Sequence, residues 1–275
     1  MLVAHHLLKL LDEAEKHGYI LENISIVPYA NPIGLSQHLL GSHIGRFSTK
    51  SGVNFNREYM DIGEAIAKRI DGKLNENSGH NVNLIREALL AEIDSKVTGI
   101  EEYEMKRLLY KIASPCDIVI DLHCDSDAVL HMYTSDRLWP QISDLAAELK
   151  TECNLLAPAN GFDSFDEACS CPWAYLADRF PSYPIPMGCE AVTVELRGES
   201  DVSYRNSNNG LSHITACRYQ TVVTSQDMSV SRYVEKLKVV TRTTATITAT
   251  SVSLILAFTS PPYIFLDSLN RCTMS

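Results

Sequence analysis

The chain has 275 residues, of which 24 are Lys or Arg and 34 are Asp or Glu, and its formal net charge is −10 at pH 7. This acidic balance excludes a general nucleic-acid binder, because such proteins carry a basic footprint. Hydrophobic residues make up 45% of the sequence, which excludes disorder throughout and is enough to fill a sizeable core. The length favours one large α/β domain, or one domain with an appendage.

Helices and strands alternate through the first two thirds of the chain. The patterns predict, in chain order, a helix over 2–17 that stops at Gly18, a buried strand over 24–29 with a turn at 31–34, helix 101–113, strand 117–125, a helix near 137–152 and strand 191–198. Strands of this kind between helices are typical of a three-layer α/β fold, with a mainly parallel or mixed sheet covered on both faces. Ligands bind such sheets at the carboxyl ends of strands, which selects residues 30–57, 121–127 and 193–201.

The composition changes near residue 203. Residues 1–203 hold 17 basic and 31 acidic residues, a net charge of −14, whereas 204–275 hold 7 and 3, a net charge of +4. We therefore expect a domain over 1–203 and an atypical tail over 204–275. The tail is rich in Ser and Thr and is expected to be irregular or β-rich and to add little stability. An alternative interpretation is a segment translated out of frame.

One part of this tail is long enough to span a bilayer. No charged residue lies between Arg242 and Asp267. Ser and Thr dominate its first half, and Pro261-Pro262 interrupts any helix, so we expect no membrane partner.

Eight cysteines are scattered along the chain without a CxxC pair, and the first residues lack the features of a signal peptide. This pattern indicates a reduced, cytoplasmic setting. Cys169 and Cys171 form a CxC that could be a metal or redox pair, but no second pair matches it. We interpret both as structural.

Polar residues end two of the predicted strands. His123 is flanked by Asp121 and Asp125, and a carboxylate beside an imidazole is the usual means of orienting a metal ligand, although a lone histidine at a strand end is more often structural. Alternation places Asp121 and His123 on one face. Glu195 is the only acid of the strand 191–198; it is either paired with Arg197 or a general base.

A second candidate group lies in the loop region 30–57. Asn56 and Arg57 combine an amide with a guanidinium, a pair that can hold a carboxylate through several parallel hydrogen bonds. Arg46 precedes them by ten residues. Each arginine alone is more often a solvated surface charge, and it is the combination that indicates a site.

Five short motifs occur in the order found in zinc carboxypeptidase-like proteins. They are NPIG (31–34), Arg46, GVNFNREY (52–59), DLHCD (121–125) and TVELRG (193–198). The last two most resemble the succinylglutamate desuccinylase/aspartoacylase family, and the resemblance covers about residues 1–203.

The resemblance implies a zinc-dependent deacylase that hydrolyses N-acyl amino acids or similar linear amides. His123 matches the last of three Zn²⁺ ligands and Glu195 the catalytic glutamate. Arg46 matches the arginine that polarises the scissile carbonyl, and Asn56 and Arg57 match the pair that holds the substrate carboxylate. A zinc carboxypeptidase is the nearer enzyme variant.

The sequence departs from the family in its metal ligands. The family carries its first two ligands in an HxxE motif ahead of the helix that begins here at Leu2, and no HxxE occurs in the 275 residues. His5 and His6 lie within that helix and are not expected to be ligands. We therefore expect a domain that lacks the first strands and binds zinc poorly. The alternative function is a non-catalytic remnant or carboxylate-binding module. If the chain does bind metal, residues among His5, His38 and His43 must complete the site.

Overall fold

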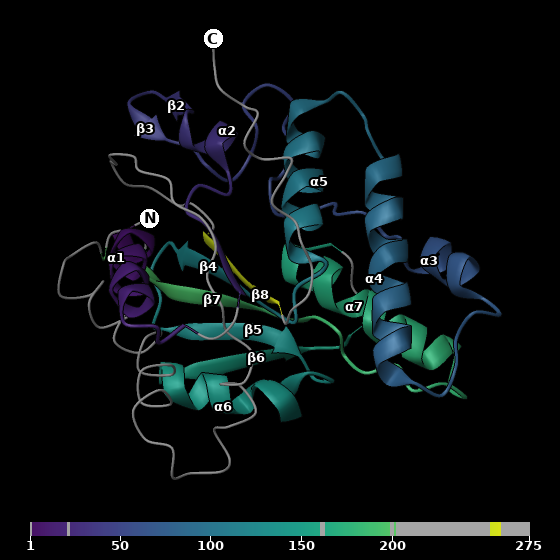
Figure 1. Cartoon of the computed structure of the whole chain (residues 1–275). Helices are drawn as coiled ribbons and strands as arrows, with labels where there is room; N and C mark the ends of the chain where they lie inside the picture. Colours follow the sequence, from purple (N-terminus) through teal and green to yellow (C-terminus); the bar gives the residue numbers. More distant parts are fainter. Residues whose placement is uncertain (1, 21–22, 160–162, 199–200, 202–253, 260–275) are drawn as a thin grey trace.

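The computed structural model describes residues 2–20, 23–159, 163–198, 201 and 254–259. A six-stranded sheet runs through the middle of the molecule, and helices cover both of its faces (Figure 1). This is the three-layer α/β fold that the sequence predicts.

The sheet is mixed, and its strand order is β1-β8-β4-β7-β5-β6. β4 pairs in parallel with β7, and β5 pairs in parallel with β6, whereas β5–β7, β1–β8 and β4–β8 are antiparallel. The strands are β1 (Asn23–Val27), β4 (Ile118–Asp125), β5 (His131–Ser135), β6 (Cys153–Ala157), β7 (Glu190–Gly198) and β8 (Leu254–Thr259). A separate two-stranded hairpin of β2 (His38–Leu39) and β3 (Ser42–His43) follows the short helix α2 (Pro32–Leu35).

Two apolar cores lie on opposite faces of the sheet. One core is formed by α1 (Leu2–Lys16) and α6 (Trp139–Leu149) against alternate residues of β4 and β7. The other is formed by α3 (Gly63–Ile70), α4 (Ser78–Ser95), α5 (Glu101–Ala113) and α7 (Phe165–Arg179). Because strand residues alternate between faces, the face that packs Val119 and Ala191 against α5 and α7 is also the face that carries Asp121, His123 and Glu195.

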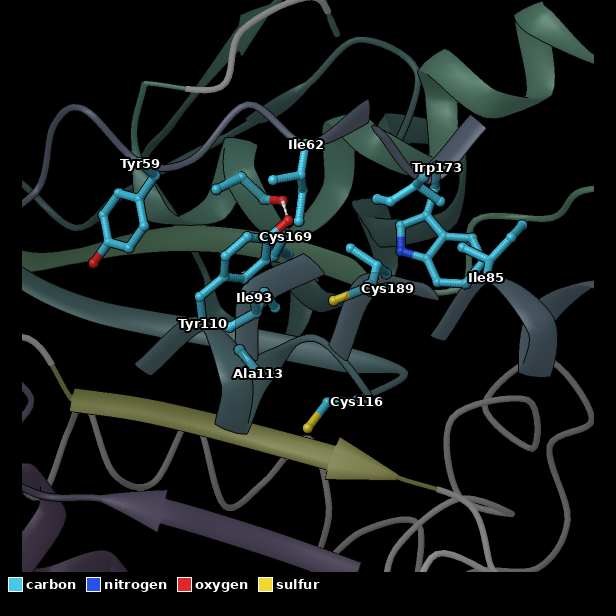
Figure 2. Close-up of a cluster of buried hydrophobic side chains, with 14 of the residues drawn as sticks. Tyr59, Ile62, Ile85, Ile93, Tyr110, Ala113, Cys116, Cys169, Trp173 and Cys189 are labelled. Carbon is cyan, nitrogen blue, oxygen red and sulfur yellow. Dashed lines mark hydrogen bonds between the residues drawn. The ribbon is translucent and has the colours of Figure 1, made fainter. Parts of the chain in front are cut away.

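The second core contains most of the buried sulfur of the described chain (Figure 2). Cys116, Cys169 and Cys189 are buried there, and the Tyr110 hydroxyl donates to the carbonyl of Ala168 over 2.6 Å. Burial raises the pKa of the Cys169 thiol well above its ordinary value, so this thiol stays protonated and unreactive. These findings agree with a structural interpretation of Cys169, whereas Cys171, although buried, lines the cavity described below, so its interpretation stays a prediction.

One stretch of the C-terminal segment is described. The sequence predicts an irregular or β-rich tail, and Leu254–Thr259 forms β8, inserted between β1 and β4 in the main sheet. That the tail adds little stability stays a prediction. Six consecutive residues without charge, Gly or Pro suit a strand that is paired on both sides. Nothing in the composition of the tail predicts that this stretch joins the main sheet.

The rest of the tail, including most of the uncharged stretch 243–266, lies outside the described residues. Within the part that is described, no helix is both long enough and apolar enough to cross a membrane.

Candidate functional site

A cavity of about 610 Å³ opens at the carboxyl ends of β4 and β7. All five residues singled out in the sequence line it, namely Arg46, Asn56, Arg57, His123 and Glu195. They come from two sources: the strand ends supply the acid–base residues, and the loops between α2 and α3 supply the basic residues and the amide. We call these the strand wall (Asp121, His123, Glu195) and the loop wall (Arg46, Asn56, Arg57).

Sheet register brings the strand wall together. His123 of β4 is the register partner of Glu195 of β7, and their side chains approach to 3.7 Å between Nδ1 and Oε1. On its other side, His123 Nε2 lies 2.6 Å from Oδ2 of Asp121, which is buried. The imidazole is thus held between two carboxylates. Asp121 and His123 share a face, as alternation predicts.

These charges set the protonation of the strand wall. Burial by itself lowers the pKa of His123, but the charge and hydrogen bond of Asp121, together with the charge of Glu195, outweigh it and raise the pKa to about 9. Burial raises the pKa of the Glu195 carboxyl, and the charges of His123 and His131 partly oppose that shift. At neutral pH, His123 is therefore a cation beside a carboxylate whose proton affinity is increased.

Two carboxylate oxygens of the strand wall lack a partner within the described part of the chain. They are Oδ1 of Asp121 and Oε2 of Glu195, and both are buried. The alternative pairing of Glu195 with Arg197 is wrong: Arg197 is exposed with a φ of 119°, and Glu195 pairs instead with His123. A buried polar atom without a hydrogen bond is costly, so these two oxygens are available to a polar or charged ligand.

The NPIG motif explains the position of Arg46. Asn31 caps α2 by accepting from the Gly34 amide over 2.8 Å, and its own amide donates to the Gly45 carbonyl over 2.9 Å. A Cβ on Gly34 would lie 2.3 Å from the Asn31 amide nitrogen and 2.6 Å from the Gly45 oxygen, so only glycine fits there. The motif thus fastens the backbone next to Arg46, whose side chain is exposed at the cavity.

The Asn56–Arg57 pair is already engaged with the start of α7. The Asn56 side-chain oxygen accepts from the backbone N–H of Phe165 over 3.0 Å, which leaves its amide nitrogen as the donor that the side chain can offer to a ligand. The Nε atom of Arg57 lies 3.2 Å from Asp163, and its Nη1 donates to the Asn56 carbonyl. The pair therefore offers fewer hydrogen-bond donors to a carboxylate than the sequence implies. The N–H groups of Nη2 are the donors of Arg57 that these contacts leave available.

Three residues near the strand wall were missed in the sequence. Asp166 lines the cavity and is buried; burial raises its carboxyl pKa, and a hydrogen bond from Ser164 opposes the shift. His131 is the register partner of Glu195 on β5, so Glu195 lies between histidines on both neighbouring strands. Tyr59 is buried against the cavity. None of them follows a recognisable strand-end motif. Polar and apolar residues do alternate at the start of HMYTS (131–135), the only local signal for this strand.

The residues present do not by themselves fit the zinc ion that the resemblance implies. Within the described ranges, no three His, Cys, Asp or Glu side chains are grouped so as to hold a metal, whereas a catalytic zinc takes three protein ligands. His43 lines the cavity with the ring of His38 5.4 Å away, but the two do not form a metal group with His123. His5 lies on α1, which packs on the opposite face of the sheet.

Two solved structures have a fold similar to that of this chain. A structure from Shewanella amazonensis SB2B shares 22% identity at a TM-score of 0.60, covering 78% of this chain and 58% of its own. A second from Shewanella frigidimarina NCIMB 400 shares 22% identity at a TM-score of 0.62, covering 78% and 57%. Both are named as proteins of the succinylglutamate desuccinylase/aspartoacylase family. This chain thus matches under three fifths of their length. No protein-family model matches the sequence, and no curated protein does.

Proposed function

We propose that this chain carries the site of a deacylase-type hydrolase that cleaves linear amides bearing a carboxylate, such as N-acyl amino acids. The observation that carries the proposal is the meeting of an acid–base wall and a basic wall around one cavity at the strand ends. The family named for the two structures of the same fold supports this reaction class.

Each wall has a distinct role in the proposed reaction. Glu195 takes a proton from the attacking water and later delivers it to the leaving amine, a role that its raised pKa suits. Arg46 stabilises the oxyanion that develops on the carbonyl. The Asn56 amide and Arg57 hold the substrate carboxylate. Asp121 fixes the orientation of His123, whose positive charge keeps Glu195 ionised.

A carboxylate-binding module without hydrolysis is the second candidate. It is favoured by the incomplete set of metal donors among the described residues, because the hydrolases that the chain resembles use zinc. In this case the loop wall binds a carboxylate and the strand wall serves recognition alone.

A direct assay separates the two functions. The purified 275-residue chain is incubated with a panel of N-acetyl and N-succinyl amino acids, with added Zn²⁺ and with chelator, and release of the free amine is measured beside the zinc content. Amine release that disappears in Glu195→Gln supports the hydrolase. Saturable binding of the same compounds with no release in either condition supports the binding module. Release from dipeptides in preference to acylated amino acids would favour the carboxypeptidase variant.

A further inference from the structure

Lys106 is a buried lysine close to the loop wall, and neither wall includes it. It lies on α5 and is only 2% exposed. Its Nζ donates to the backbone carbonyl of Arg57 over 2.6 Å and lies 5.1 Å from the ring of Tyr103 and 5.9 Å from that of Tyr59. Lysine is almost never fully buried without a partner, since burying its charge is costly. An unbranched apolar side chain of similar length, such as that of Met, would be buried at this position without that cost.

The backbone that Lys106 contacts is in an unfavourable conformation. Glu58, directly after Arg57, has a φ of 58°, in the left-handed region that residues with a side chain seldom adopt. Its N–H donates to Asp163 over 2.9 Å, and its carboxylate accepts from the Tyr103 hydroxyl over 3.0 Å. Such a conformation persists only where surrounding contacts determine it. Lys106, Tyr103 and Asp163 are those contacts on the two sides of the peptide that follows Arg57.

The charge of Lys106 adds to the effect of its hydrogen bond. Burial lowers the pKa of the lysine, while the nearby carboxylates of Glu58, Asp163 and Glu102 favour its charged form. Those carboxylates offset part of the field of the lysine, and solvent screens what reaches the exposed guanidinium of Arg57. The charge therefore adds modestly, and an anionic ligand at Arg57 benefits chiefly from the fixed geometry.

We infer that Lys106 is a positioning residue of the carboxylate site: it fixes the backbone of Arg57 and makes the loop wall selective for an anionic ligand. The inference rests on the proposed binding of a carboxylate by Arg57. It assigns a functional reason to a buried lysine of α5 that lies outside the apolar core.

The test compares ligands that differ only in charge. A panel of N-acetyl amino acids is titrated into the full chain beside the matching α-amides, and the ratio of the two affinities is the readout. Lys106→Met should reduce the preference for the carboxylate about tenfold while leaving the affinity for the amide unchanged, because a merely structural defect would weaken both. Lys106→Arg should restore most of the preference, since it keeps a buried donor and charge. Lys111→Met, on the same helix but bonded to Asp94 at 2.6 and 2.8 Å, is the matched control and should change nothing.

The remaining outcomes are decisive as well. If Lys106→Met keeps the full preference while Arg57→Gln loses it, the inference is wrong and the proposed carboxylate site stands. If the wild-type chain binds acid and amide equally, the carboxylate site itself is refuted and the inference with it. Should Lys106→Met fail to fold, Tyr103→Phe removes another contact of the same segment, and a preference unchanged in that variant counts against the inference.

Discussion

The two walls of the cavity are positioned by different means. In the strand wall, backbone pairing of β4 with β7 sets His123 opposite Glu195, and alternation sets Asp121 beneath the imidazole. In the loop wall, side-chain hydrogen bonds from α2 and α7 hold a segment with little regular structure. Sheet register is shared by many residues, whereas the loop wall depends on a few named contacts.

The side chains of the strand wall are also more buried than that of Arg57 in the loop wall. The side chains of Asp121, His123 and Glu195 are 2%, 18% and 12% exposed, and that of Arg57 is 43% exposed. Electrostatic interactions are strong in the strand wall and screened in the loop wall, where an exposed ion pair contributes little. In the proposed reaction, chemistry therefore falls to the more buried wall and ligand recognition to the more exposed one.

The largest expected effect is on turnover, if the proposed hydrolysis takes place. Glu195→Gln removes the carboxylate that accepts a proton and keeps its shape, so kcat should fall by roughly 10² or more, the usual scale for a general base. Substrate binding should change little, because the carboxylate of the substrate is held by the opposite wall. Single-turnover rates beside equilibrium binding check both parts, and a variant with full turnover would remove Glu195 from the mechanism.

Stability should depend on pH through the strand wall. The pKa of His123 is raised from 6.5 to about 9, so its contribution is fully present below about pH 6.5 and is lost as the pH rises through 9. The free energy of unfolding should therefore fall by about 1–2 kcal/mol between pH 6 and 8 from this group alone. Denaturant titrations at both pH values should show a smaller fall in Asp121→Asn. An equal fall in the variant would mean that Asp121 does not set the pKa of His123.

A change in the loop wall should alter binding more than chemistry. Arg57→Ala should raise KM roughly tenfold with kcat nearly unchanged, because the arginine holds a carboxylate that is present in substrate and transition state alike. Steady-state kinetics resolve the two constants. Arg137→Ala, whose partner is the exposed Asp178, is a suitable control, and a fall in kcat for Arg57→Ala would place that residue in the chemical step.

The smallest expected effect concerns the start of α7, which supports the loop wall. Ser164 and Glu167 form a capping box there, and the next residue, Phe165, donates to Asn56. Ser164→Ala should lower the free energy of unfolding by about 1 kcal/mol, the usual cost of losing such a cap. Denaturant unfolding measures this change. A further loss of carboxylate affinity would show that the cap also sets the position of Asn56.

Much of the fold could be predicted because its elements have simple patterns. The helix over 101–113 is observed as α5 with the same bounds, and β4 and β7 begin within a residue of the predicted strands. The five site residues line one cavity because strand ends and loops meet at one edge of the sheet, as the rule for α/β folds predicts.

The helices α4 and α7 were not predicted, because their sequences lack a simple periodic pattern. In α7, most residues are buried and Pro172 lies inside the helix, so it has no polar face that shows a helical period. α4 buries Arg86 and Glu92, which bond to Asp117 and Arg69 respectively. The contacts of Arg57 with Asp163 and Lys106 join residues far apart in sequence, and no local pattern encodes them.

The insertion of β8 has a consequence for the order of folding. β1, from the start of the chain, pairs with β8 and with no other strand in the described part, so Asn23 finds its partner only at Thr259. A growing polypeptide cannot close this sheet until residue 259 has left the ribosome. Pairings so distant in sequence slow folding, because the entropy of closing the intervening chain is lost before any contact compensates for it. We expect α1 and β1 to be the last elements to become protected from hydrogen exchange during refolding, well after the α5–β4–β7 unit.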